Sequence, residues 1–268
     1  MLDWARRADA AGFSSLGTLD RLVYPNWEPL VALGAAAAVT ERIGLTTAIL
    51  ILPYRAGAAV VAKQAATVHA LSGGRLVLGV AIGSRGDDYE AAGVPLATRG
   101  ERFEQMLDEM KRIWAGEGRG YAGGIGPDVS DNPPPLILGG RADAGFRRAA
   151  RYGEGWIMGG APPDAFPPMV EKLDAAWRAE GRENEPRRMA ITYFSLDEDP
   201  EAQARRTLGH YYAIAGDYAE TIVAGTAKGE DEVRERVRAF EHVGCDELIM
   251  FPASSDPGQV DRLAAAVL

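Results

Sequence analysis

Apolar and polar residues follow one another in a regular order along this chain. Seven short apolar runs, rich in β-branched residues, predict strands at 13–19, 43–52, 75–82, 136–138, 155–158, 188–196 and 246–251. Apolar residues at helical spacing predict helices at 2–11, 28–40, 58–71, 98–115, 142–151, 164–180, 200–215, 230–243 and 257–267. Strands that alternate with helices in this way are typical of a parallel sheet with right-handed crossovers.

The alternation extends over all 268 residues, which favours an α/β fold of the TIM-like (β/α)8 barrel type over an open doubly wound sheet. Because the chain starts with a helix, the first strand of the barrel is expected to precede Met1 and to be missing from this chain. We expect a single barrel domain over 1–268. Within it, residues 116–135 are rich in glycine, contain the run Pro133-Pro134-Pro135 and show no regular spacing of apolar residues. This segment is therefore predicted to be an excursion or insertion.

Composition excludes several classes of function. The 38 acidic and 29 basic residues give a net charge of −9, which argues against binding to nucleic acid or to an anionic membrane. One cysteine and three histidines, widely spaced, predict neither an internal disulfide nor a metal site. The chain has no apolar run approaching the roughly 18 residues of a transmembrane helix and no signal peptide, so a cytoplasmic protein is expected.

In a barrel, ligands bind at the loops that follow the carboxyl ends of the strands. Two consecutive predicted strands end in Gly139-Gly140 and Gly159-Gly160. The helix after the first pair has free N–H groups at its start that can bind an anion, and the Arg141 guanidinium can donate two hydrogen bonds to a phosphate. The alternative is that both pairs are tight turns without a ligand. No G-x-G-x-x-G follows a strand, which disfavours a Rossmann dinucleotide site.

Two polar residues at strand ends are the catalytic candidates. Asp20 can orient a cofactor or accept a proton at the mouth, or form only a surface ion pair with Arg21. Ser84 can donate a hydrogen bond to a ligand, or act only as a helix N-cap. The run His210-Tyr211-Tyr212 can line a pocket or belong to an ordinary amphipathic helix. The sequence has no G-x-S-x-G elbow, no H-E-x-x-H and no evident nucleophile–base pair, so hydrolase chemistry is disfavoured.

Several stretches, in order along the chain, resemble the luciferase-like flavin-dependent oxidoreductases, the bacterial luciferase superfamily with its deazaflavin-dependent reductases. The resemblance rests on motifs spread from the first predicted helix to the fifth predicted strand. These are Asp9-Ala10-Ala11-Gly12-Phe13, Glu28-Pro29-Leu30, Thr40-Glu41-Arg42-Ile43-Gly44-Leu45, Ala62-Lys63-Gln64-Ala65-Ala66-Thr67, Ser72-Gly73-Gly74-Arg75-Leu76, Thr98-Arg99-Gly100-Glu101-Arg102-Phe103 and Ala149-Ala150-Arg151-Tyr152-Gly153-Glu154-Gly155-Trp156.

The resemblance implies where a flavin would bind. It implies a non-prolyl cis peptide near Ala48-Ile49 that supports the ring, and places Asp20 and Ile82-Gly83-Ser84 near the ring. It assigns Gly139-Gly140, Arg141 and Gly159-Gly160 to the phosphate end. Two positions depart from the family pattern: Arg21 stands where many deazaflavin enzymes have histidine, and Ser84 where some have an acid.

Three functions remain open at this point. The first is a monooxygenase that uses reduced FMN, supplied by a separate flavin reductase, and oxygen on a small organic substrate. The second is hydride transfer with an 8-hydroxy-5-deazaflavin coenzyme. The third is a non-catalytic flavin-binding protein. The resemblance also implies a homodimer.

Overall fold

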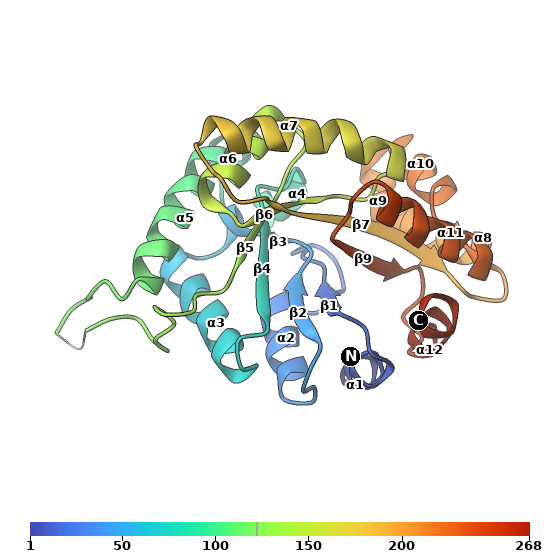
Figure 1. The fold of residues 1–268 in the computed structure, drawn as a ribbon, viewed down its shortest axis with the longest axis horizontal. Coiled ribbons are helices and arrows are strands. Elements are labelled where there is room, and N and C mark those ends of the chain that lie inside the picture. The colour runs from blue at the N-terminus through green and yellow to red at the C-terminus, as the bar shows by residue number, and fades with distance from the viewer. Residues whose placement is uncertain (122) are drawn as a thin grey trace.

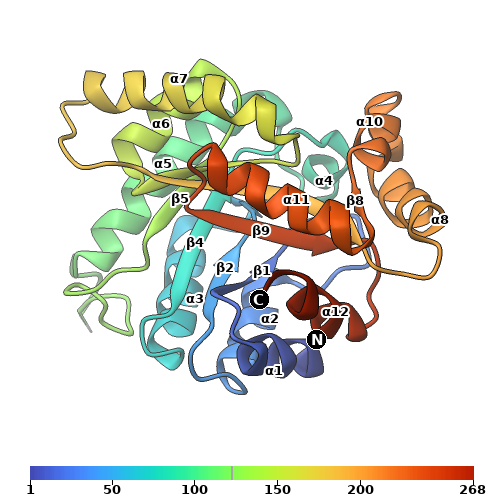
Figure 2. The same cartoon turned by 45° about the vertical axis from the view of Figure 1, so that its right-hand side comes forward.

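The computed structural model describes residues 1–121 and 123–268, which form a nearly closed barrel of parallel strands surrounded by helices (Figures 1 and 2). The strands are β1 (Ser15–Thr18), β2 (Gly44–Thr47), β3 (Leu50–Ile51), β4 (Leu76–Ala81), β5 (Leu136–Gly139), β6 (Gly155–Met158), β7 (Arg187–Ser195), β8 (Ala227–Lys228) and β9 (Glu247–Pro252). They pair in the order β1-β2-β4-β5-β6-β7, with β3 beside β4 and both β8 and β9 beside β7. All of these pairs are parallel, which confirms the predicted barrel.

Helices cover the outer face of the barrel. They are α1 (Leu2–Ala11), α2 (Pro29–Ala37), α3 (Ala58–Leu71), α4 (Gly86–Ala91), α5 (Arg99–Trp114), α6 (Asp143–Tyr152), α7 (Phe166–Ala179), α8 (Pro200–Ala204), α9 (His210–Tyr212), α10 (Tyr218–Ala224), α11 (Gly229–His242) and α12 (Gly258–Val267). A π-helical turn, Arg205–Gly209, joins α8 to α9, and the 3-10 turn Ala213–Ala215 follows α9.

Two apolar layers hold this arrangement together. Between the strands and the helices, the rings of Phe146, Trp156, Phe166 and Phe240 form a chain of aromatic contacts. Inside the barrel, side chains from several strands fill the space: Ala48, Ile137, Ile157, Met189, Ile191 and Ile249. Burying one such side chain contributes roughly 1.5–3 kcal/mol, so the barrel interior is a packed core.

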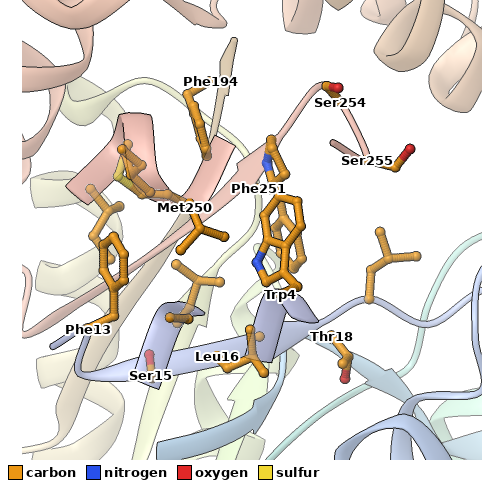
Figure 3. A pocket seen from close by; sticks show the side chains of 18 of the residues that line it. Trp4, Phe13, Ser15, Leu16, Thr18, Phe194, Met250, Phe251, Ser254 and Ser255 are labelled. Carbon is orange, nitrogen blue, oxygen red and sulfur yellow. The ribbon is translucent and has the colours of Figure 1, made fainter. Parts of the chain in front are cut away.

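One pair of neighbouring strands is not joined. No backbone ladder connects β1 to β9 in the described part of the chain. At their amino ends, the hydroxyls of Ser14 and Ser15 donate to Glu247 Oε1 over 2.7 and 2.5 Å. Farther along the strands a cleft of about 590 Å³ lies beside them, lined also by residues of α1 and α12 (Figure 3). A barrel strand preceding α1 would lie at this seam.

The sequence prediction was wrong in several details of secondary structure. The predicted strand 43–52 is divided into β2 and β3, and residues 52–54 form a 3-10 turn. Strand β8 and helices α4 and α10 were not predicted. The helix expected over 200–215 is a series of short α, π and 3-10 turns.

The segment predicted as an excursion contains no helix or strand in its described residues, 116–121 and 123–135. It projects from the end of α5 in Figure 1. Lys63 Nζ donates to the Gly126 carbonyl over 2.9 Å, which attaches this loop to α3. Ala122 lies outside the described residues.

Candidate functional site

The floor of the candidate site lies where β2 passes into β3. The peptide bond Ala48–Ile49 is cis, at the place that the family resemblance implies. The Ile49 side chain packs against the backbone of β5, because a Cβ on Gly139 would lie only 2.7 Å from Ile49 Cδ1. Gly83 is similarly tight: its φ is +64°, and a Cβ there would lie 2.7 Å from Ile51 Cγ2. Glycine at these two strand ends therefore allows the isoleucines to lie against the main chain.

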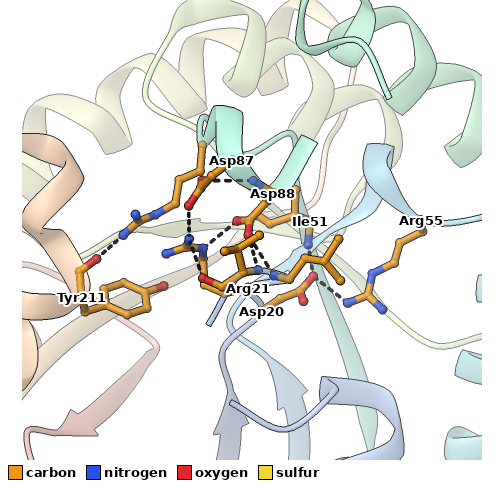
Figure 4. Close-up of polar contacts among 10 residues, drawn as sticks. Asp20, Arg21, Ile51, Arg55, Asp87, Asp88 and Tyr211 are labelled. Atoms are coloured by element: carbon orange, nitrogen blue, oxygen red, sulfur yellow. Dashed lines mark hydrogen bonds and ion pairs between the residues drawn. The ribbon is translucent and has the colours of Figure 1, made fainter. Parts of the chain in front are cut away.

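Asp20, at the end of β1, is buried and anchors two other segments (Figure 4). Its Oδ2 accepts the N–H of Ile51 over 2.8 Å and pairs with Arg55 Nη2 over 2.7 Å. Arg55 also pairs with Glu28, whose other oxygen caps α2 at Val31 N–H over 2.7 Å. The alternative of a surface ion pair between Asp20 and Arg21 is thus wrong, since the carboxylate joins β1 to β3 inside the protein.

Arg55 lies between two carboxylates, those of Asp20 and Glu28. Burial alone would lower the pKa of Arg55, but Asp20 and Glu28 raise it above its usual range. Burial and then the negative charge of Asp20 raise the pKa of the neighbouring Tyr54 phenol. The Tyr54 hydroxyl and Arg55 Nε are buried without a hydrogen-bond partner in the described residues. Two polar atoms beside Asp20 therefore have unused hydrogen-bonding capacity.

Arg21 turns away from Asp20 and binds the start of α4 (Figure 4). Its Nε donates to Asp88 Oδ2 over 2.6 Å, and its Nη2 donates to Asp87 Oδ2 over 2.9 Å. Asp88 Oδ1 accepts the N–H groups of Leu22 and Val23 over 3.0 and 2.7 Å. Burial would lower the pKa of Arg21, but Asp88 in particular raises it. This buried network fixes the loop that follows β1.

Ser84 is exposed, and its hydroxyl makes no hydrogen bond within the described residues. It is not an N-cap, because α4 begins at Gly86 after Arg85 and has no side-chain cap. That alternative from the sequence is therefore wrong. The neighbouring Arg85 guanidinium donates to the Tyr211 carbonyl. Ser84 thus lies at the mouth with its hydroxyl available to a ligand.

The two predicted glycine pairs lie next to each other and are bridged by Arg141. Arg141 Nη2 donates to the carbonyls of Gly160 and Gly159 over 3.0 and 3.3 Å. Gly140 has a φ of +151° and closely approaches Gly145 in α6, where a Cβ would meet the Gly145 Cα at 3.2 Å. Gly159 faces open space, since a Cβ at this residue would have no other atom within 4 Å. Tight packing explains Gly139 and Gly140, whereas Gly159 is free to face a ligand.

A cluster of tyrosines, which the sequence pattern did not single out as one site, covers this end of the barrel. The Tyr193 and Tyr212 hydroxyls lie 2.5 Å apart, and the Tyr193 ring fills the space beside Gly160, where a Cβ would lie 2.4 Å from its Cε2. Tyr218 donates to the Gly160 carbonyl over 3.1 Å, and Tyr211 packs edge-on against Tyr24. The run His210-Tyr211-Tyr212 was the available signal, and the structure places its two tyrosines in this cluster.

Burial keeps these phenols neutral. It raises the pKa of Tyr211 to about 12 and that of Tyr193 well above its usual value. Burial also raises the pKa of Tyr212, although the hydrogen bond with Tyr193 lowers it in part. At neutral pH the cluster therefore offers hydroxyl groups and aromatic edges rather than charges.

Two features are absent from the described part of the chain. Within the described residues, no group of three or more histidine, cysteine or carboxylate side chains is placed to hold a metal ion. None of the described helices has the length and apolar character needed to cross a bilayer.

Comparison with known proteins establishes the class to which this fold and site belong. The family model described as luciferase-like monooxygenase matches residues 1–242, so the chain belongs to that family.

Three proteins illustrate the relationship. The pyrimidine monooxygenase RutA of Variovorax paradoxus is 31% identical over 212 residues, which cover 71% of this chain and 54% of RutA. An F420-dependent secondary alcohol dehydrogenase in complex with an F420-acetone adduct superposes with a TM-score of 0.82 at 18% identity, over 99% of this chain and 93% of that one. The FMN complex of the oxygenating constituent of 3,6-diketocamphane monooxygenase from Pseudomonas putida gives a TM-score of 0.76 at 17% identity, over 100% and 92%.

Proposed function

We propose that this protein is a monooxygenase that uses reduced FMN and oxygen on a small uncharged organic substrate. The observation that carries the proposal is the state of the carboxylates at the mouth. Asp20, Asp87 and Asp88 are all paired with arginine, so none of these three is free to act as a general base. A site whose carboxylates are all engaged in ion pairs suits a reaction in which the cofactor supplies the chemistry better than a reaction that needs a protein base.

The residues present fit a flavin. Ile49 gives an apolar surface that packs against Gly139, the exposed Ser84 follows β4, and the tyrosine cluster contacts Gly160. We assign Asp20, Ala48, Ile49, Ile82, Gly83 and Ser84 to the ring end of the site. Gly139, Gly140, Arg141, Gly159 and Gly160 belong to the phosphate end, where the uncapped amino end of α6 adds favourable N–H groups.

Bound reduced flavin would supply the electrons with which oxygen is activated. The chain's own contribution is to bind, orient and exclude water. Asp20 and Arg55 fix the end of β1 relative to β3, so the floor keeps its shape. The hydroxyls of Tyr193 and Tyr212 hydrogen-bond to each other, which leaves one O–H of the pair to donate to a carbonyl oxygen of the substrate without adding charge.

We further propose that a separate flavin reductase delivers the reduced FMN and that the working unit is a homodimer. A cleft of about 680 Å³ on the outer face of α2 and α3 supports a dimer, because exposed Val31, Val60 and Leu71 line it. Sedimentation equilibrium tests this assignment, and a monomer at all concentrations would contradict it.

Binding experiments test the cofactor assignment. The apoprotein is titrated with FMN, riboflavin and the deazaflavin coenzyme F420, each in its reduced form under anaerobic conditions. We expect FMN to bind most tightly and riboflavin to bind more weakly because it lacks the phosphate. Tighter binding of F420 than of FMN would overturn the proposal.

Turnover is tested with the FMN-loaded protein. Oxygen uptake and product formation are followed with a panel of pyrimidines and cyclic ketones, the substrate types named for RutA and for the diketocamphane enzyme. FMN binding without an oxygen-dependent product from any compound would favour a non-catalytic flavin-binding protein.

Hydride transfer with the deazaflavin is the second candidate function, and one observation favours it. The His210 ring lies 6.0 Å from that of Tyr24, beside the tyrosine cluster, and its imidazole nitrogens can form a hydrogen bond with a substrate hydroxyl. If this function is correct, the protein reduces F420 with a secondary alcohol, and His210→Gln lowers that rate while F420 affinity is retained.

A further inference from the structure

Tyr193 points into the mouth of the barrel near the carboxyl end of β7. Successive residues of a strand point to opposite faces, so Tyr193 lies on the same face as Met189 and Ile191, which fill the barrel interior. Its ring packs against that interior group and lies 6.5 Å from the Phe251 ring of β9, between centroids. Side chains at this end of the strands are the ones that meet the ligand in a barrel of this type.

The Tyr193 hydroxyl has one hydrogen-bond partner among the described residues, the Tyr212 hydroxyl of α9 at 2.5 Å. Two hydroxyls that share one hydrogen bond leave one O–H free to donate to a third group. Both tyrosines are half-buried, so the pair is not sealed inside the protein. The free O–H belongs to whichever of the two tyrosines tolerates negative charge better.

Positive charge lies on the Tyr212 side of the pair. Burial raises the pKa of the Tyr212 phenol, and the hydrogen bond with Tyr193 lowers it in part. The charges of Arg85 and Arg141 also lower the pKa of Tyr212. At Tyr193, by contrast, burial and the neighbouring tyrosines all raise the pKa. Negative charge is therefore tolerated better at Tyr212, and Tyr193 is the donor in the hydrogen bond between the two.

The two arginines keep their charges available to this site. Within the described part of the chain, Arg85 donates to the Tyr211 carbonyl, and Arg141 donates to the carbonyls of the second glycine pair and, over 3.4 Å, to the Tyr218 hydroxyl. None of these partners is a carboxylate, so no ion pair neutralises either guanidinium there. Fixed hydroxyls and charges of this kind stabilise negative charge that develops on a bound oxygen atom.

We propose that Tyr212 is a catalytic residue that donates a hydrogen bond to the carbonyl oxygen of the substrate, and that Tyr193 is a positioning residue that donates to Tyr212. The substrate is accordingly a carbonyl compound, and Arg85 and Arg141 stabilise the negative charge that its oxygen gains during the reaction. This inference rests on the proposed function, because it names the substrate class of that same site.

A phenol tests the proposal without flavin and without turnover. The probe is para-nitrophenol, because its anion carries negative charge on the oxygen of a small planar ring and absorbs visible light. The matched control ligand is para-nitroanisole, whose oxygen cannot ionise. Both are titrated into the flavin-free protein by equilibrium dialysis, at a pH at which free para-nitrophenol is mostly protonated, and the absorption spectrum of the bound probe is recorded.

We expect the probe to bind as its anion, so its visible absorption should increase on binding, because nearby positive charge favours the charged form. Tyr212→Phe should weaken this binding at least about tenfold, which is the loss expected for a hydrogen bond to a charged group. Tyr193→Phe should weaken it about threefold to tenfold and lower the ionised fraction of the bound probe. Binding of para-nitroanisole should be the same in all of these proteins.

Two further variants complete the experiment. Tyr24→Phe is the matched control, because it removes a hydroxyl of the same cluster that makes no hydrogen bond within the described residues, and it should leave the affinity for the probe unchanged within error. Arg85→Gln keeps both hydroxyls of the pair and should lower the ionised fraction of the bound probe. Circular dichroism of each variant checks that it is folded.

Other results would overturn the proposal. A probe that binds only in its protonated form, or equally well to Tyr212→Phe, would mean that no charged oxygen is held at Tyr212. A larger loss from Tyr193→Phe than from Tyr212→Phe would make Tyr193 the donor to the ligand. Absence of probe binding by a protein that binds FMN would refute this subsite and leave the proposed function standing, whereas absence of FMN binding would refute the proposed function itself.

Discussion

Removing the Asp88 carboxylate should be one of the more damaging single changes at the mouth of the barrel. Asp88 is 2% exposed and accepts three hydrogen bonds, from Arg21 Nε at 2.6 Å and from two backbone N–H groups at 3.0 and 2.7 Å. Asp88→Ala leaves the buried Arg21 with Asp87, at 2.9 Å, as its remaining carboxylate partner among the described residues. Breaking a buried ion pair costs about 3–5 kcal/mol. Because Asp87 still compensates part of the charge, we expect a loss of ~3 kcal/mol, at the lower end of that range.

Urea denaturation followed by circular dichroism measures this loss. With a denaturant slope of about 3 kcal/mol/M, the unfolding midpoint should fall by about 1 M. Arg21→Met and the double variant Asp88→Ala/Arg21→Met complete a cycle. The double variant should lose about 2 kcal/mol less than the sum of the single losses, since it no longer contains an uncompensated guanidinium.

The control is Glu220→Gln, which breaks the exposed pair with Arg205 and should leave the midpoint unchanged within error. Two results would refute the reasoning. One is a midpoint for Asp88→Ala that matches the control. The other is additivity of the two single losses within about 0.5 kcal/mol, because it would show that Arg21 and Asp88 do not depend on each other.

Three further predictions concern separate parts of the molecule. Gly159 faces open space, and Gly159→Asp should weaken the binding of FMN at least about tenfold in a fluorescence titration, because the new carboxylate repels the phosphate. FMN binding to Gly159→Asn and riboflavin binding to Gly159→Asp should change little, because each of these pairs lacks one of the two charges. Burial would raise the pKa of Asp9, but the N–H groups of residues 41–43 lower it overall. Its stabilising effect is therefore full above its unfolded pKa and is lost as the pH falls through the lower pKa of the folded state, so the stability difference between the protein and Asp9→Asn should shrink as the solution is acidified. Burial raises the pKa of Cys245 to about 12, so a thiol reagent at a pH of about 8 should react far more slowly with the folded protein than with the protein in urea, and equal rates would contradict the assigned burial.

The sequence predicted the architecture well where the regular spacing of apolar residues and the residues that end an element agree. Helix α3 has the predicted bounds, 58–71, because a long apolar period ends at Ser72-Gly73-Gly74. The prediction failed where the deciding interaction is short or geometric. Hydropathy cannot show the cis peptide that divides 43–52 into two strands, and β8 has too few residues to show a period. Helix α4 was hidden by the charges of Asp87 and Asp88, which serve Arg21 rather than a solvent face.

The sequence predicted where the residues of the candidate site lie along the chain, but not which side chains they pair with. Asp20, Ser84 and the glycine pairs lie at strand ends, where barrel topology requires them. Which charge pairs with which depends on contacts between residues far apart in the chain: Asp20 pairs with Arg55, and Arg21 with a carboxylate 67 positions away. The same limit applies to the tyrosine cluster, since Tyr193 and Tyr212 come from different elements. A single sequence does not contain this information.

The seam also determines how the order of the chain relates to the order of the barrel. Met1 and Leu268 both line the cleft beside β1 and β9, so the two ends of the chain meet at one place on the wall. Joining them with a short linker and cutting the loop after α5 would give a circularly permuted chain with every strand pair intact. In such a chain β9 and β1 become near neighbours in sequence, so contacts between them such as the Ser15–Glu247 hydrogen bond change from long-range to local ones.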